Sequence, residues 1–246
     1  MEQFIVVLVA MLMSITPFYN DNESSQERED RMTIIATAIA NTSFEATCSG
    51  SFDIEECVPA FNGTSQELSV GLFTVGFWES KFAKHIHKNK CRRGGEDKNG
   101  VWHRGECDEV LIGKDGKVLD KPQEALIGRR YFRARSMWQV QYEKLIKDEW
   151  NLMIGKDNSG ADLFDPTSLE ATTAATWAAT KKFARCWPKT NNTEYQSSTI
   201  SVFRCYGGAR TKARDGHKNG PNNRAFFFNE RMKQFTRIYE ELNNVN

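Results

Sequence analysis

Apolar side chains recur every three or four residues in several stretches of the chain, which is typical of amphipathic helices. After a Ser-rich, acidic start, for example, Met32, Ile35 and Ile39 follow one another along a single helical face. A later stretch opens with Asp165-Pro166-Thr167 and places Glu170 three residues further on, which are start signals of a helix. The sequence therefore predicts a mainly α protein, with helices over residues 25–42, 66–82, 165–185 and 224–242.

The helix predicted over residues 66–82 carries apolar side chains on nearly every face. One face holds Leu68, Leu72, Val75 and Phe82. Three more aromatic residues lie on the other faces: Phe73, Phe77 and Trp78. A helix that is apolar all round is normally buried, so we expect this one to lie at the centre of the fold.

An unbroken apolar run extends from Phe4 to Met13. It is too short to span a bilayer. A secretory signal would carry positive charge before this run, whereas only Glu2 and Gln3 stand there, and no small-residue cleavage pattern follows. The pattern favours a buried first helix, with a signal peptide as the alternative.

Two polar segments separate the predicted helices, at residues 89–122 and 207–223. Both are rich in glycine, and long polar loops inside a compact domain are often functional. There are no internal repeats and no low-complexity linker. We interpret residues 66–246 as the main domain and residues 1–65 as a helical subdomain packed against it.

The 246 residues carry a net charge of only +1, but the charge is unevenly distributed. Residues 1–60 hold ten acids and two arginines, whereas residues 81–93 hold six Lys or Arg and no acid. A basic region favours an anionic polymer such as cell wall or nucleic acid, or is simply a solvated face.

The six cysteines form three local pairs along the sequence. An even count with short spacing indicates disulfides and an oxidising compartment, although buried free thiols are the alternative. The expected pairs are Cys48 with Cys57, Cys91 with Cys107, and Cys186 with Cys205.

Glu79 is the strongest candidate for a catalytic residue. Its position, seven residues after Leu72 and four after Val75, places it on the apolar face of the predicted central helix. A carboxyl group there loses water, which favours the protonated form that can donate a proton to a glycosidic oxygen. The alternative is a helix-end glutamate that reaches Lys84 or solvent.

Four segments in order strengthen this interpretation. They are Glu79-Ser80 at a helix end, residues 134–140 (ARSMWQV), the Asp165-Pro166 helix start, and residues 201–208 (SVFRCYGG). Together they resemble the lytic transglycosylase and goose-type lysozyme superfamily over roughly residues 66–208. That family shows a Glu-Ser, a Gly-Leu-Met-Gln-Ile-like segment, a helix entered through an Asp-Pro-type turn, and an Ala-Tyr-Asn-x-Gly-like segment.

The resemblance implies a lysozyme-like fold and a role for four residues. Glu79 would be the general acid/base, and Ser80 would support the site beside it. Gln139 would contact the substrate or the catalytic carboxylate, and Tyr206 would hydrogen-bond towards Glu79 or the sugar N-acetyl group. The sequence departs from the family pattern where Ser136 replaces a glycine, where Trp138 precedes Gln139, and where no asparagine follows Tyr206.

A second carboxylate would decide the reaction. An inverting hydrolase needs a base at about 6.5–9.5 Å from the acid. The candidates all lie in the polar loop after Glu79: Glu96, Asp97, Glu106 and Asp108. With one acid alone, the C6 hydroxyl of the sugar attacks instead and forms an anhydro product, as the transglycosylase resemblance implies.

Three other interpretations of the sequence are alternatives to the hypothesis of a glycosidase. Zinc could bind at residues 85–107, whose ligands would be His85, His87, Cys91, His103 and Cys107. Single-stranded nucleic acid would suit the basic, Phe-rich stretch at residues 204–237, but the Phe spacing there predicts a core helix. A glycan-binding module could keep the fold without the chemistry.

We therefore expect an enzyme that cleaves the β-1,4 bond between N-acetylmuramic acid and N-acetylglucosamine in peptidoglycan. No cofactor, metal or nucleic-acid partner is expected, nor a membrane span. The protein is expected to act outside the cell, in the cell envelope or as part of a virion.

Overall fold

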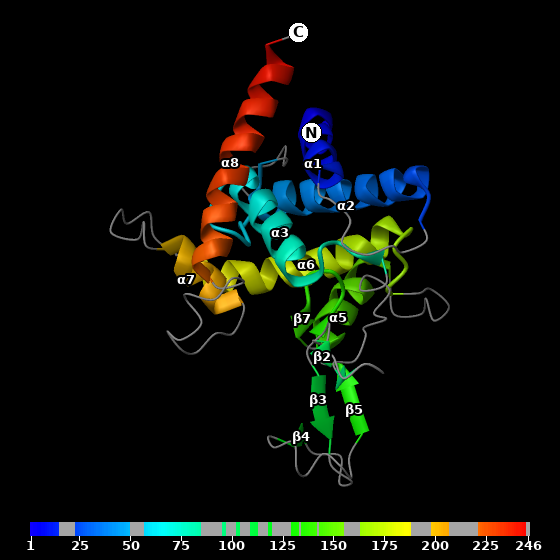
Figure 1. Cartoon of the computed structure of the whole chain (residues 1–246). Coiled ribbons are helices and arrows are strands. Elements are labelled where there is room, and N and C mark those ends of the chain that lie inside the picture. Colours follow the sequence, from blue (N-terminus) through cyan, green and yellow to red (C-terminus); the bar gives the residue numbers. More distant parts are fainter. Residues whose placement is uncertain are drawn as a thin grey trace.

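Among the residues that it describes, the computed structural model contains seven helices and seven short strands, arranged as in Figure 1. It describes residues 1–14, 23–49, 57–84, 95–96, 102–103, 109–112, 118–119, 129–132, 134–141, 143–154, 163–187, 198–206 and 221–244. The helices are α1 (Glu2–Met13), α2 (Ser25–Ala46), α3 (Ser65–Ser80), α5 (Glu143–Ile154), α6 (Leu169–Cys186), α7 (Ser198–Tyr206) and α8 (Pro221–Asn243). The prediction of a mainly α protein is confirmed.

The strands are two to four residues long and pair only in an antiparallel manner. Strands β1 (Gly95–Glu96) and β2 (Trp102–His103) pair with each other. Strand β3 (Glu109–Ile112) pairs with both β4 (Val118–Leu119) and β5 (Arg129–Phe132). Strands β6 (Ala134–Arg135) and β7 (Val140–Gln141) form a hairpin next to the helices. The β3–β5 ribbon projects from the helical part at the end opposite to both chain termini (Figure 1).

Helix α3 lies at the centre of the helical part, as its apolar sequence predicts. Every residue from Leu68 to Gly76 is buried. Two glycines allow bulky neighbours to approach closely, because an added Cβ would lie 2.5 Å from the Phe183 ring at Gly71 and 2.4 Å from the Phe82 ring at Gly76. The helix begins with a capping box between Thr64 and Glu67.

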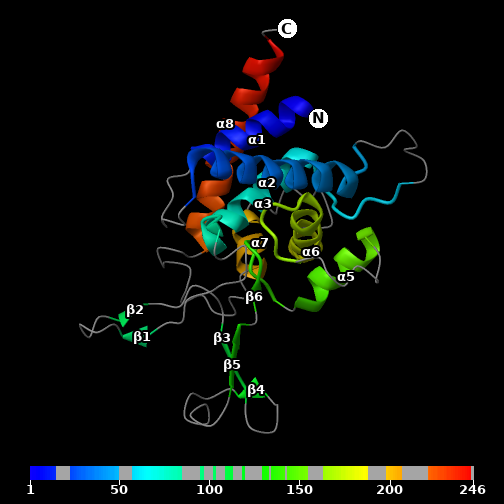
Figure 2. The same cartoon turned by 90° about the vertical axis from the view of Figure 1, so that its right-hand side faces the viewer.

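Helices α2, α6 and α8 pack against α3, and α1 lies on the outer side of α2 (Figures 1 and 2). Helix α1 packs on α2 and α8, and it buries five apolar side chains: Phe4, Val7, Leu8, Met11 and Leu12. The prediction of a buried first helix is confirmed. The segment 1–65 thus contributes to the same hydrophobic cluster as α3, α6 and α8.

The predicted helix boundaries need correction at several ends. Helix α2 continues to Ala46, and α8 already begins at Pro221. The Asp165-Pro166-Thr167 signal starts a turn rather than the helix: Asp165 Oδ1 accepts hydrogen bonds from the Thr167 amide and hydroxyl. Ser168 then caps α6, because its side chain accepts from the Ala171 amide.

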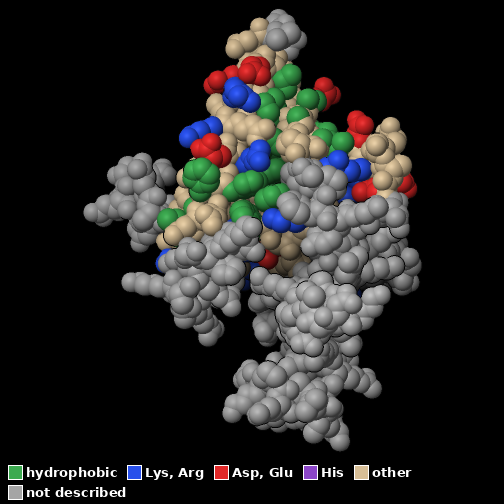
Figure 3. All heavy atoms as spheres, viewed as in Figure 1, with side chains coloured by type: hydrophobic (Ala, Val, Ile, Leu, Met, Phe, Trp, Pro, Cys, Tyr) green, Lys and Arg blue, Asp and Glu red, His purple; other side chains and the backbone are tan. Residues whose placement is uncertain are grey.

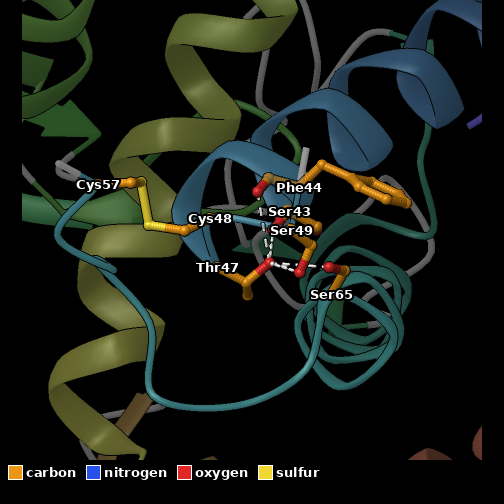
Figure 4. Close-up of a disulfide and its surroundings, with 7 residues drawn as sticks. All are labelled: Ser43, Phe44, Thr47, Cys48, Ser49, Cys57 and Ser65. Carbon is orange, nitrogen blue, oxygen red and sulfur yellow. Dashed lines mark hydrogen bonds between the residues drawn. A yellow bond between two sulfur atoms is a disulfide. The ribbon is translucent and has the colours of Figure 1, made fainter. Parts of the chain in front are cut away.

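Two of the three expected disulfides are present. Cys48–Cys57 closes the segment after α2, and Cys186–Cys205 joins the end of α6 to α7. Beside Cys48, Thr47 Oγ1 donates to the Ser43 carbonyl and lies 2.8 Å from Ser65 Oγ at the start of α3 (Figure 4). The expected Cys91–Cys107 pair lies outside the described residues.

None of the described helices combines the length and apolar character needed to cross a bilayer. Helix α1 has only 12 residues.

Candidate active site

Glu79 lies in the last turn of α3, and the backbone turns sharply just after it. Lys81 and Phe82 both adopt the left-handed conformation, with φ values of 56° and 54°. Ser80, 2% exposed, stabilises this turn. Its hydroxyl donates to the Gly76 carbonyl at 3.0 Å and accepts from the Phe82 amide at 3.1 Å. Ser80 thus supports the helix end that presents Glu79.

Helix α2 holds the same turn from the other side through Arg31. The Arg31 side chain is buried and binds both carboxylate oxygens of Glu23, at 2.7 and 2.8 Å. Its remaining nitrogen, Nη1, donates to the Phe82 carbonyl at 2.7 Å. Lys84 lies 3.8 Å from Glu23.

The segment resembling Gly-Leu-Met-Gln-Ile forms the β6–β7 hairpin, whose turn spans residues 136–139 and is buried. Ser136 and Gln139 have φ values of 61° and 48°. The backbone of Ser136 is thus left-handed, a conformation that glycine adopts without steric cost. The Trp138 indole donates to the Leu72 carbonyl at 3.0 Å, which attaches the hairpin to α3.

Gln139 is 7% exposed, and its side-chain amide forms a hydrogen bond within the turn. Its Nε2 donates to the Ser136 carbonyl at 2.9 Å. The side-chain oxygen of Gln139 remains the group that could accept a hydrogen bond from a substrate. In this structure Gln139 shapes the hairpin and makes no described hydrogen bond to Glu79.

Tyr206, the last residue of α7, is buried against the same hairpin. Its hydroxyl donates to the Trp138 carbonyl at 3.1 Å, not to Glu79. Burial raises the pKa of Tyr206 well above its usual value, and the nearby negative charge of Glu79 raises it further, while Arg224 opposes this. Tyr206 is therefore a neutral donor at any physiological pH.

Glu79 itself pairs with Arg224, from the first turn of α8. Arg224 Nη1 lies 2.5 Å from Glu79 Oε1, and the two side chains are 14% and 21% exposed. The sequence predicts a dry carboxyl group among Phe77, Trp78 and Phe82. The structure instead gives a partly buried carboxylate in an ion pair with a guanidinium group.

A second cation, Lys81, lies next to this ion pair. Its ammonium group lies 3.7 Å above the centre of the Phe77 ring and 4.4 Å from that of Trp78. Burial and the positive charge of Arg224 lower the pKa of Lys81 to about 8, although Glu79 acts in the opposite direction. The Lys81 ammonium therefore loses its charge close to physiological pH.

The Phe227 ring from α8 covers the end of α3. Phe227 stacks on Phe77, with ring centres 4.7 Å apart and planes within 5° of parallel. Arg231 lies on Phe227, 4.7 Å from the ring centre. Among the described residues, the buried Trp78 indole nitrogen has no hydrogen-bond partner. The result is a cluster of rings and cations around Glu79.

The structure thus brings together three of the four segments named in the sequence analysis. Trp138 connects the hairpin to α3, and Tyr206 connects α7 to the hairpin. The local sequence carries no signal for the roles of Arg224, Lys81 and Arg31. Arg224 lies 145 residues from Glu79, and no local pattern distinguishes it from the other basic residues near it.

The other candidate groups lie outside the residues whose side chains are described. This holds for the possible second carboxylates, Glu96, Asp97, Glu106 and Asp108, and for the five zinc ligands proposed within residues 85–107. Among the side chains that are described, no cluster of three or more His, Cys, Asp or Glu could hold a metal ion.

Comparisons of the chain with protein-family models, with curated proteins and with solved structures found no significant match. The case for a function therefore depends on the residues themselves.

Proposed function

We propose that this protein is a peptidoglycan lytic enzyme with a lysozyme-like fold and Glu79 as its general acid/base. The observation that carries the proposal is the meeting of the Glu79 helix end, the 134–141 hairpin and Tyr206. These segments are far apart in the sequence, and they occur in the order of the lytic transglycosylase pattern. Trp138 donates to the Leu72 carbonyl on α3, seven residues before Glu79, and its own carbonyl accepts from Tyr206.

In the proposed reaction, protonated Glu79 donates its proton to the glycosidic oxygen between N-acetylmuramic acid and N-acetylglucosamine. The bond from C1 to that oxygen breaks, and the oxygen keeps the electron pair. The C6 hydroxyl of the muramyl residue then bonds to C1 and returns a proton to Glu79. The products are a 1,6-anhydromuramyl end and a free 4-hydroxyl group. If water attacks instead, the enzyme is a lysozyme.

Two further features fit this role. Tyr206, neutral and buried, can orient the site without adding charge. The two disulfides suit an oxidising location such as the cell envelope, the extracellular space or a virion. Peptidoglycan glycan strands would be the partner, and the reaction requires no cofactor.

The direct test is digestion of purified peptidoglycan sacculi, followed by mass spectrometry of the released muropeptides. We expect anhydromuramyl ends from the wild type and at least a hundredfold slower release from Glu79→Gln, as for loss of a general acid. Glu230→Gln on α8, where the side chain is 48% exposed, is the matched control and should release fragments normally. Reducing ends in place of anhydro ends would identify a hydrolase.

The Arg224 ion pair favours a second candidate, a glycan-binding module without catalysis, because Glu79 is held as a carboxylate. A sedimentation assay with intact sacculi separates the two. An enzyme loses fragment release in Glu79→Gln but still binds sacculi. Binding by the wild type without any release would reject the enzyme in favour of the module.

A further inference from the structure

Two consecutive residues after the end of α3 adopt an unfavourable backbone conformation. Lys81 and Phe82 are both left-handed, although neither is a glycine, the residue that adopts this conformation without steric cost. Such a conformation persists only where the surrounding contacts enforce it. The contacts that hold this turn therefore also hold the last turn of α3, on which Glu79 lies.

Local hydrogen bonds close one side of the turn. The Lys81 amide donates to the Phe77 carbonyl at 3.0 Å, and the Ala83 amide donates to the Ser80 carbonyl at 3.1 Å. The partners in these bonds are close neighbours in the sequence. Because helix ends fray, such local bonds alone hold the end of α3 only weakly.

Phe82 adds contacts to more distant parts of the chain. Its ring is 1% exposed and packs directly against Gly76 on α3. Its carbonyl accepts a hydrogen bond from Arg31 Nη1 at 2.7 Å, and the two residues are 51 positions apart in the sequence. This hydrogen bond ties the turn to a second helix, α2.

The Arg31 guanidinium group is oriented by a partner outside the turn. Its Nε and Nη2 bind the two carboxylate oxygens of Glu23, in the bidentate geometry that fixes the plane of a guanidinium group. Arg31 is 4% exposed, so its side chain is also confined by its surroundings. The third nitrogen, Nη1, is thereby directed at the Phe82 carbonyl.

We propose that Arg31 is a positioning residue for the reaction: its hydrogen bond to the Phe82 carbonyl holds the left-handed turn closed and thereby keeps the Glu79 carboxyl group in place. The inference rests on the proposed function. Arg31 acts through the backbone of the turn and not through contact with the substrate. It also gives the segment 1–65 a part in the candidate active site, because α2 belongs to that segment.

The test separates this role from the contribution of Arg31 to stability. The double variant Arg31→Met/Glu23→Gln loses both charges of the buried pair, so the net charge is unchanged and neither partner is left charged and unpaired. It does lose the donor to the Phe82 carbonyl. Glu23→Gln keeps that donor, but its guanidinium group loses an ionised partner. Muropeptide release from peptidoglycan gives kcat and KM for each variant, at a temperature at which all are folded.

We expect kcat to fall about tenfold or more in the double variant, because small displacements of a catalytic group are costly. KM should stay within about twofold of the wild type, because the hairpin and Tyr206 are unchanged. In Glu23→Gln, kcat should stay within about threefold of the wild type although urea unfolding shows a loss of stability. Arg237→Met, at an exposed position on α8, should change neither constant.

Two results would overturn the inference and leave the proposed function intact. One is an unchanged kcat in the double variant. The other is a kcat that follows stability, so that Glu23→Gln loses as much activity as the double variant. If the double variant does not fold, Arg31→Lys takes its place, because lysine keeps the charge but lacks the fork of donors. The same fall in kcat at constant KM is then expected, and an unchanged kcat would overturn the inference.

Hydrogen–deuterium exchange measures the turn itself, whether or not the protein is active. The amides of Phe82 and Ala83 should exchange several times faster in the double variant than in Glu23→Gln, whereas residues 68–76 should be equally protected in both. Equal exchange at the turn would overturn the inference. A wild type that releases nothing from peptidoglycan would overturn the proposed function and, with it, the catalytic consequence of the turn.

Discussion

Replacing Arg31 with methionine tests whether α2 holds the turn that follows Glu79. The substitution leaves the Glu23 carboxylate, 7% exposed, without its two bonds from the guanidinium group, and it removes the donor to the Phe82 carbonyl. Breaking a buried ion pair on one side typically costs about 3–5 kcal/mol. Lys84, 3.8 Å from Glu23, compensates part of the negative charge that is left unpaired on Glu23. We therefore expect a loss of about 3 kcal/mol in the free energy of unfolding.

The assay is urea unfolding of Arg31→Met, Glu23→Gln and the double variant, with the disulfides kept oxidised. The double variant should be no less stable than Arg31→Met, because neither partner is then left charged and unpaired. Arg237→Met is the control: its ion pair with Glu241 is exposed, and we expect a change below about 0.5 kcal/mol. A loss of less than about 1 kcal/mol in Arg31→Met, or simple additivity of the two substitutions, would refute the reasoning.

Three further predictions follow from the described contacts. Gly71→Ala should destabilise the protein by about 1–3 kcal/mol in urea unfolding, because the new Cβ would lie 2.5 Å from the Phe183 ring. Ala at exposed Asn229 on α8 is the control, and a neutral result for Gly71→Ala would contradict the close packing. Ser136→Gly should raise the unfolding temperature, because a left-handed backbone costs about 1–2 kcal/mol in residues other than glycine. The substitution also removes the hydrogen bond from the Trp138 amide to the Ser136 hydroxyl, but this bond is long at 3.4 Å. A lower unfolding temperature would contradict this reasoning. The pKa of Lys81, about 8 in the folded protein and 10.5 for ordinary lysine, means that the unfolded chain binds more protons between these values. Stability from Lys81 should therefore rise with pH across this window, and Lys81→Met should show a weaker rise in unfolding experiments at pH 8 to 10; identical slopes would show that Lys81 titrates normally.

The central helix and two disulfides could be predicted because their signals are local. An all-round apolar stretch can only be buried, so the position of α3 followed from residues 66–82 alone. The short spacing of the cysteines likewise indicated the Cys48–Cys57 and Cys186–Cys205 pairs.

Helix α5 was not predicted, although part of its pattern is present. Ile146 and Trp150 are both buried and are four residues apart. Helix α7 has only nine residues, which is too short for a clear periodic signal. Strands of two residues, such as β6 and β7, leave no alternating pattern at all.

The environment of Glu79 could be predicted only in part. Its place at a helix end and on an apolar face followed from helical spacing. The ion pair with Arg224 depends on how α8 crosses α3, and that geometry has no counterpart in the local sequence. The sequence predicts a desolvated acid at Glu79, whereas the structure shows an ion-paired carboxylate. This difference is therefore a result of tertiary packing.

The Cys186–Cys205 disulfide has a consequence for when the site can form. Cys205 immediately precedes Tyr206, so this covalent bond anchors the residue that meets Trp138. Closing a loop across 19 residues lowers the conformational entropy of the unfolded chain, which stabilises the folded protein by about 3 kcal/mol. A chain held in a reducing compartment lacks that restriction, and we expect its α7 to dock less firmly. For the peptidoglycan lytic enzyme proposed above, oxidation after export would then complete the site only in the compartment that contains the polymer.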